Sequence, residues 1–296
     1  MANWEERFRD WAGGPGDTEQ ERCENAERVI RNAIKTSDEL KSLDLEVFSQ
    51  GSYRNVTNIP QESDVDVAVC LLETMYYEIP PGTEPSQFGI VPSNREFRPY
   101  KKAVAKALID YCGIENVTVG NKAIRVHSNT YHVDADVVAN WLFREYFDPS
   151  RPRYFRDGVK FLSDDGKWIT NYPKQHIEEG IRKNERTSKR FKRVVRVIKR
   201  LQAEMVDEKV ISDALPSFFI ESLVYNVPDD HFGHTQYTDD VRAALAYLFN
   251  NTRVTDDPSK WLEANGVKYL FDPTQPWTQA QAHAFVSTAW DYSGFD

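Results

Sequence analysis

Asp64 and Asp66 are separated by a single residue and are the side chains of this sequence best suited to chemistry. They alternate with Val65 and Val67, and a strand with this alternation projects both carboxylates from one face, about 6.8 Å apart. Two carboxylates at one place repel unless a cation compensates them, and such oxygen ligands suit Mg²⁺, which also binds substrate phosphates. The pair therefore predicts a metal site that handles phosphates. The alternative is that both acids face solvent from an edge strand.

A second pair of acids lies further along the chain, where Asp134 and Asp136 alternate with apolar residues. If this segment forms a strand close to the first, it can supply the third carboxylate that completes a two-metal site. The residues alone leave Asp134 and Asp136 as alternatives for that third ligand.

A glycine turn precedes the first acid pair. Gly51 and Ser52 follow a β-like run, and eleven residues separate Ser52 from Asp64. A Gly-Ser pair at a junction between a strand and a helix offers backbone N–H groups and a hydroxyl to a phosphate. This turn is therefore a second candidate for contact with a phosphorylated substrate.

The elements that must position these residues are predicted from hydrophobic spacing. A helix covers residues 29–34, strands cover 45–48 and 65–71, residues 73–99 form an irregular insertion, and a helix begins near Tyr100. Short β-like runs follow at 117–119, 123–127 and 132–138. Beyond residue 170 the pattern is helical, at 184–205, 216–226, 237–250 and 275–290. We therefore expect an α+β domain over residues 1–170 and a helical domain over 171–296.

Charge is segregated along the chain. The sequence has 37 Lys and Arg against 46 Asp and Glu, a net charge of −9, which disfavours extended nucleic-acid or anionic-lipid binding. Residues 182–200 nevertheless carry +9, with Lys192, Arg196 and Lys199 on one helical face. This face is predicted either to oppose substrate phosphates or to be a solvated surface.

The remaining composition predicts a cytoplasmic protein. The longest apolar run, residues 67–72, is far shorter than the roughly 18 residues of a membrane span. Cys23, Cys70 and Cys112 are odd in number and widely spaced, which is typical neither of a disulfide framework nor of a metal site.

Taken together, the β-run, the Gly-Ser turn and the first acid pair resemble the signature of the DNA polymerase beta nucleotidyltransferase superfamily. Further matches over about residues 25–226 resemble the bacterial cGAS/DncV-like nucleotidyltransferases, or CD-NTases. The matching segments are Gly51-Ser52-Tyr53-Arg54, Thr57, Ser63-Asp64-Val65-Asp66-Val67, Ala135-Asp136-Val137-Val138, Asn171-Tyr172-Pro173-Lys174, Arg196-Val197-Ile198-Lys199 and Pro216-Ser217-Phe218-Phe219-Ile220-Glu221.

This resemblance implies a fold and a set of site residues. The fold is a nucleotidyltransferase mixed β-sheet core with flanking helices, followed by a C-terminal helical domain, with the active site in the cleft between them. By resemblance, the catalytic metal ligands are Asp64, Asp66 and Asp136, with Asp134 as the alternative third ligand, and the ions are two Mg²⁺, with Mn²⁺ as the other option. The nucleotide-binding residues implied in the same way are Gly51, Ser52, Lys199 and Ser217.

The resemblance also implies an activity. A template-independent enzyme would join ribonucleoside triphosphates, ATP or GTP among them, into a cyclic di- or trinucleotide for anti-phage signalling (CBASS), and a separate effector would sense the product. The alternatives are transfer of a nucleotide to an RNA, a protein or a small molecule, and a catalytically silent nucleotide-binding module. The sequence leaves open the bases, the linkage, the ring size, the activation mechanism, the oligomeric state and the role of residues 73–99.

Overall fold

The computed structural model describes residues 3–60, 64–253, 255 and 257–295, so Ser63 of the acid motif lies outside the described residues. The chain folds into two compact units. One contains Met1–Gly16, Arg54–Glu62 and Lys174–Asp296, and is called here the helical unit. The other contains Asp17–Tyr53 and Ser63–Pro173, and is called the sheet unit. In place of a single boundary near residue 170, the chain passes between the units after residues 16, 53, 62 and 173.

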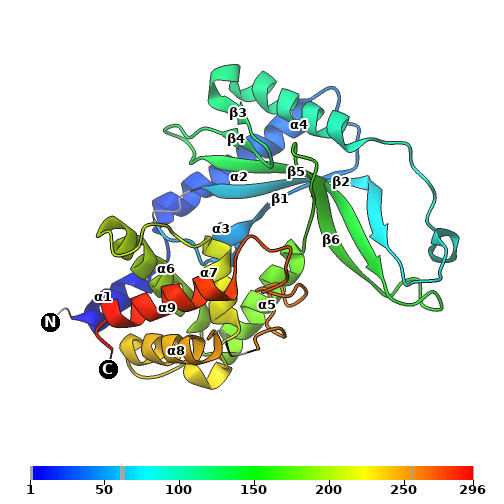
Figure 1. Cartoon of the computed structure of the whole chain (residues 1–296). Helices are drawn as coiled ribbons and strands as arrows, with labels where there is room; N and C mark the ends of the chain where they lie inside the picture. Colours follow the sequence, from blue (N-terminus) through cyan, green and yellow to red (C-terminus); the bar gives the residue numbers. More distant parts are fainter. Residues whose placement is uncertain (1–2, 61–63, 254, 256, 296) are drawn as a thin grey trace. The chain divides into compact units, whose positions relative to one another are not determined.

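The sheet unit is built on a mixed, seven-stranded sheet (Figure 1). Five strands follow the order β1-β2-β5-β4-β3, while β6 pairs with β5 and β7 pairs with β6. Strands β2 and β5 are parallel, and every other pair is antiparallel. The strands span Leu45–Gln50 (β1), Val65–Glu78 (β2), Val117–Val119 (β3), Ile124–Val126 (β4), Ala135–Tyr146 (β5), Phe155–Leu162 (β6) and Trp168–Asn171 (β7).

The predicted alternation in β2 determines which face of the sheet is covered. Helices α2 (Asp17–Thr36) and α4 (Phe97–Cys112) pack against each other and against the central strands (Figure 1). Val65 and Val67 of β2 and Val137 of β5 are fully buried in the same core cluster as Ile30 and Val104 of these helices. Because successive side chains of a strand point to opposite faces, the intervening Asp66 and Asp136 project from the other face.

The predicted irregular insertion over 73–99 is wrong at its beginning. After a register shift beyond Leu71, strand β2 continues to Glu78, and Met75 pairs with Leu142. Residues 141–146, the second half of β5, also pair with β6, and the sequence analysis did not predict this pairing. These pairings join residues that are far apart in the sequence, so the local pattern carried no signal for them.

The helical unit is organised around α6 (Phe191–Asp207), which contacts α1, α7, α8 and α9. Val194, Val195, Ile198 and Leu201 supply its buried apolar stripe, as its spacing predicts. The single helix predicted over 184–205 is wrong, because Ser188 and Lys189 have positive φ angles that end α5 before α6 begins. The other helices span Trp4–Trp11 (α1), Pro173–Arg186 (α5), Ser217–Tyr225 (α7), Tyr237–Asn251 (α8) and Gln279–Tyr292 (α9).

The four shortest helical turns connect these elements, and they span Gly51–Asn55 (α3), Pro85–Phe88 (η1), Ile114–Asn116 (η2) and Asp229–His231 (η3). Within the described part of the chain, no helix combines the length and the apolar character that crossing a membrane requires. The predicted fold class, a mixed sheet with flanking helices followed by a C-terminal helical region, is confirmed.

Candidate active site

The register of the sheet places three predicted site features and one unpredicted residue in a single row. Asp66 of β2 is the pairing partner of Asp136 on β5, and Asp136 in turn is the partner of Arg125 on β4. On the other side, Asp66 pairs with Gln50, the last residue before Gly51. Paired residues on neighbouring strands project to the same face, so both carboxylates and the guanidinium lie on the face opposite α2 and α4.

Arg125 joins two of the predicted metal ligands. Its Nη2 lies 2.7 Å from Asp64 Oδ2, and its Nε lies 2.9 Å from Asp136 Oδ1. The hydrogen bond to Asp136 is the largest of the effects that raise the pKa of the Arg125 guanidinium. All three side chains remain between 31% and 44% exposed, so the cluster is accessible to a solute from solvent.

The acids around Asp64 carry more negative charge than Arg125 alone can balance. Burial raises the pKa of Asp64, and the carboxylates of Asp134 and Asp136 raise it further, against the opposing effect of Arg125. A carboxylate whose ionisation is disfavoured in this way gains stability when a further cation binds beside it. The electrostatics therefore favour cation binding at this row.

Asp134 and Asp136 differ in what their carboxylates contact. The Asp134 carboxylate accepts a hydrogen bond from the backbone N–H of Ser128. Burial is the largest effect and opposes its ionisation, but the hydrogen bonds from Ser128 and the nearby charges of Arg125 and His127 together lower the pKa of Asp134. Asp136 instead shares Arg125 with Asp64. This difference favours Asp136 as the third ligand, and Asp134 stays the alternative.

Gly51 lies against Asp66. Its φ angle is +68°, and a Cβ added at residue 51 would overlap the Asp66 carboxylate, 2.9 Å from its Cγ. Glycine is therefore required twice here, for the positive φ and for the close approach of the backbone to the acid. Half-buried Ser52 follows in α3, so the predicted phosphate turn and the predicted metal acids are neighbours within the sheet unit.

The other two predicted nucleotide-binding residues, Lys199 and Ser217, belong to the helical unit. Lys199 lies on α6 and is 2% exposed, and Arg196 on the same helix is 6% exposed, so a solvated face is excluded for both. Ser217 begins α7, and Glu221 follows it on the same helical face. Lys199 lowers the pKa of Glu221, which places the two charges near each other.

A buried polar network surrounds Glu221, which is 1% exposed. Thr57 Oγ1 donates to Glu221 Oε2 at 2.7 Å, and His176 Nε2 lies 2.8 Å from Glu221 Oε1. Asn55 Nδ2 lies 3.1 Å from His176 Nδ1. Burial by itself opposes ionisation of Glu221, but His176, Lys199 and Thr57 outweigh burial and lower its pKa to about 2.

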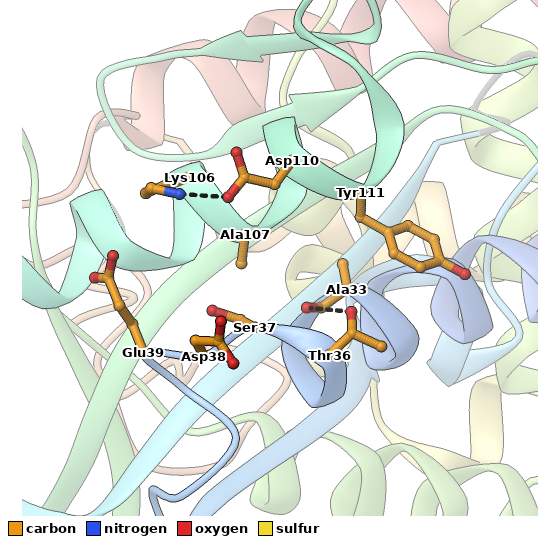
Figure 2. Close-up of a pocket in the computed structure, with 9 residues that line it drawn as sticks. All are labelled: Ala33, Thr36, Ser37, Asp38, Glu39, Lys106, Ala107, Asp110 and Tyr111. Atoms are coloured by element: carbon orange, nitrogen blue, oxygen red, sulfur yellow. Dashed lines mark hydrogen bonds and ion pairs between the residues drawn. The ribbon is translucent and has the colours of Figure 1, made fainter.

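A hollow of about 260 Å³ lies elsewhere in the sheet unit, between the end of α2 and α4 (Figure 2). Asp38, Glu39 and Asp110 line it, together with Lys106, which is ion-paired to Asp110. None of the predicted site residues lines this hollow. It therefore contributes nothing to the candidate active site.

Comparison with known proteins bears on the whole chain. Residues 178–294 match the model of the cGAS/DncV-like nucleotidyltransferase C-terminal helical domain. The chain is 39% and 35% identical to proteins named cyclic dipyrimidine nucleotide synthase CdnE, from Legionella pneumophila and Cecembia lonarensis respectively, over 98% of this chain and of each relative. The chain belongs to the cGAS/DncV-like nucleotidyltransferases. The predicted family is thereby confirmed.

A solved structure supports the same assignment of the fold. The CdnE c-UMP-AMP synthase from Rhodothermus marinus, in a structure titled with Apcpp and Upnpp, is 31% identical to this nucleotidyltransferase. It matches with a TM-score of 0.86 over 98% of this chain and 97% of that one.

The acids of this nucleotidyltransferase have the right chemistry for Mg²⁺, because carboxylate oxygens are the ligands that this ion prefers. Within the described ranges, no three acidic, His or Cys side chains are already grouped as a metal cluster. Arg125, bonded to Asp64 and Asp136, supplies positive charge at that place. The donor set fits the ion, and binding would require the carboxylates to exchange this partner for it.

Two features of the site were missed at the sequence level. Arg125 lies in the middle of a predicted β-like run, between two apolar residues. A cation at such a position, close to a strand that carries acids, could have indicated an ion pair with those acids. Glu221 was noted only as part of a resemblance, although a single acid inside the apolar run 218–224 already indicates a buried, paired charge.

Gly51→Ala is expected to reduce turnover by at least about a hundredfold, because the new methyl group must displace Asp66. Gly82→Ala is the matched control, since Gly82 has a φ of +77° but no atom near the added Cβ. Turnover and melting temperature of both variants should be compared. Equal activity of the two variants would contradict a functional contact between Gly51 and Asp66.

Glu221→Gln is expected to flatten the acid dependence of stability. With a folded-state pKa of about 2 against an ordinary value of 4.5, ionised Glu221 stabilises the fold above pH 4.5. That stabilisation, up to about 3 kcal/mol, is lost as the pH falls from 4.5 to 2. Urea unfolding at several pH values measures it, with exposed Glu185→Gln as control. A stability difference that does not shrink across this window would contradict the assignment.

Proposed function

We propose that this nucleotidyltransferase condenses two ribonucleoside triphosphates into a cyclic dinucleotide, without template or added acceptor. The observation that carries the proposal is the pairing of Asp66 with Asp136 on adjacent strands, beside Gly51. The similarity of the whole chain to proteins named as cyclic nucleotide synthases supports it. The names of these relatives specify products with different bases. The bases that this chain uses are therefore to be identified by the product analysis described below.

The proposed metal ligands are Asp64, Asp66 and Asp136, which would hold two Mg²⁺ ions. Bound there, the ions would lower the pKa of the attacking ribose hydroxyl and neutralise charge on the leaving pyrophosphate. The proposed role of Gly51 and Ser52 is to hold the triphosphate beside these acids. For Lys199 and Ser217 we propose contact with nucleotide phosphates, which needs Lys199 to reach a phosphate from its buried position.

The proposed reaction occurs twice. In each round, a ribose hydroxyl oxygen of one nucleotide forms a bond to the α-phosphorus of a triphosphate. The bond from that phosphorus to the bridging oxygen of pyrophosphate breaks, pyrophosphate leaves, and the hydroxyl proton passes to solvent. In the second round the hydroxyl and the triphosphate belong to the same linear intermediate, so its two ends exchange places and the ring closes. Holding both groups in one site removes the cost of a bimolecular encounter.

The biological setting that we propose is anti-phage signalling in the cytoplasm, where ribonucleoside triphosphates are available. A cyclic dinucleotide released there would act on a separate effector protein. Family membership supports this proposed setting.

The central test is incubation of the purified protein with Mg²⁺ and labelled ribonucleotides, followed by phosphatase treatment and mass spectrometry. We expect a phosphatase-resistant cyclic product from the wild type and none from Asp66→Asn, which should fold normally. Asp38→Asn is the control because its side chain is 92% exposed on a turn. A labelled product that forms only after RNA, protein or a small acceptor is added would refute the proposal.

Arg125→Gln is expected to bind Mg²⁺ about fivefold more tightly in the absence of nucleotide, because the guanidinium competes for Asp64 and Asp136. Melting temperature measured against Mg²⁺ concentration reports this affinity without any need for activity. Arg31→Gln, which removes an equal charge paired with Glu27 on α2, is the control. Unchanged or weaker Mg²⁺ binding in Arg125→Gln alone would argue against a metal at these acids.

A further inference from the structure

The chain between the glycine turn and the first metal acid belongs to the helical unit. Gly51 and Asp64 lie in the sheet unit, but the intervening Arg54–Glu62 is part of the helical unit. Within this connecting segment, Asn55, Thr57, Asn58 and Ile59 are each no more than 2% exposed. A connecting segment usually runs over the surface, but these four residues are buried, and three of their side chains are polar.

Three side chains of the helical unit hold this segment, and we call them the clamp: His176 on α5, Arg196 on α6 and Glu221 on α7. Glu221 accepts the hydrogen bond from Thr57, and His176 contacts both Asn55 and Glu221. Arg196 Nη1 donates to the backbone carbonyl of Val56 at 2.6 Å. Three consecutive residues of the segment are thus held by three different helices.

The backbone of the segment is strained at Val56, the residue whose carbonyl accepts a hydrogen bond from Arg196. Val56 has a φ angle of +56°, a conformation in which a β-branched residue is a genuine outlier. Its side chain is 50% exposed, so burial of that side chain does not explain the strained conformation. Such strain persists only where the surroundings over-determine it, and here Arg196 bonds the carbonyl of the strained residue itself.

Two members of the clamp, Arg196 and Glu221, carry charges that are costly to bury. Arg196 and Glu221 are 6% and 1% exposed, and Arg196 also donates to the carbonyl of Ala12 at 3.0 Å. A buried ionic group is weak support for stability compared with an apolar side chain of similar volume, but it specifies one arrangement of the groups that it contacts. The arrangement specified here is the path of the chain from the glycine turn towards the acids.

We propose that His176, Arg196 and Glu221 are positioning residues that set how α3 places Ser52 beside the metal acids, by holding residues 55–57 at and just beyond the end of that turn. This inference rests on the proposed function, because it assigns the clamp to the geometry of the phosphate turn and the metal acids. The clamp does not touch the reacting atoms. Loosening it leaves every proposed ligand present but lets the Ser52 hydroxyl shift relative to the acids, which slows the chemical step more than it weakens nucleotide binding.

The test removes one hydroxyl from the segment. In Thr57→Val the donor to Glu221 is lost at nearly constant volume, and we expect kcat to fall about tenfold while KM for each nucleotide changes less than about threefold. Thr57→Ser restores the hydroxyl and is expected to stay within about twofold of the wild-type kcat. All values are taken per folded enzyme, with the folded fraction measured by thermal melting.

Thr252→Val is the matched control. Thr252 is also 0% exposed, belongs to the helical unit, and its Oγ1 donates to the Leu248 carbonyl at 2.7 Å. Like Thr57→Val, the Thr252→Val variant loses the hydrogen bond of a buried hydroxyl group. That bond does not hold residues 55–57, so the kcat of Thr252→Val should equal that of the wild type. If Thr57→Val fails to fold, Arg196→Lys takes its place, because it keeps the charge and removes the guanidinium that reaches Val56.

The outcomes separate the two proposals. A wild-type protein that makes no cyclic product refutes the proposed function. An active wild type with equal kcat losses in Thr57→Val and Thr252→Val, or with no loss in either, overturns the clamp alone. A loss in Thr57→Val that appears in KM and leaves kcat unchanged also overturns it. A loss of kcat that Thr57→Ser restores supports the positioning role.

Discussion

Repulsion between carboxylates on adjacent strands is the constraint on which the candidate site depends. Asp66 and Asp136 are register partners, and Asp64 joins them through Arg125. The sheet tolerates this concentration of negative charge because the opposite face of the same strands is fully buried against α2 and α4. Apolar burial on one face stabilises the register, and the register then imposes the acid row on the other.

The helical unit also contains a negative charge that must be balanced, but this charge is buried, whereas the acids of the sheet unit are partly exposed. Glu221 is ionised in the interior because His176, Lys199 and Thr57 surround it. Lys199 was predicted to face a phosphate, and in the structure it is buried and lowers the pKa of this carboxylate. The proposed phosphate contact would require this lysine to exchange the carboxylate for a phosphate, which its long and flexible stem allows.

Local patterns predicted the elements whose residues alternate or repeat at short range. The alternation over 65–71 and over 132–138 indicated two strands, and the apolar stripe of α6 indicated its helix. The continuation of β2 beyond Leu71, strands β6 and β7, and the break between α5 and α6 were missed. Each of these depends on pairing across the sheet or on a few positive φ angles, which leave little trace in local hydrophobic spacing.

The sequence by itself determined the family and the mixed fold, and it singled out the acids and the glycine to which we assign the chemistry by proposal, because residue type and spacing along one strand are local properties. Only the tertiary structure decided which side chains pair with these charged groups. Arg125 reaches Asp64 across 61 residues, and Thr57 reaches Glu221 across 164 residues. Which distant side chain balances a charge depends on strand register and helix packing, and these are settled only when the whole chain buries its apolar faces.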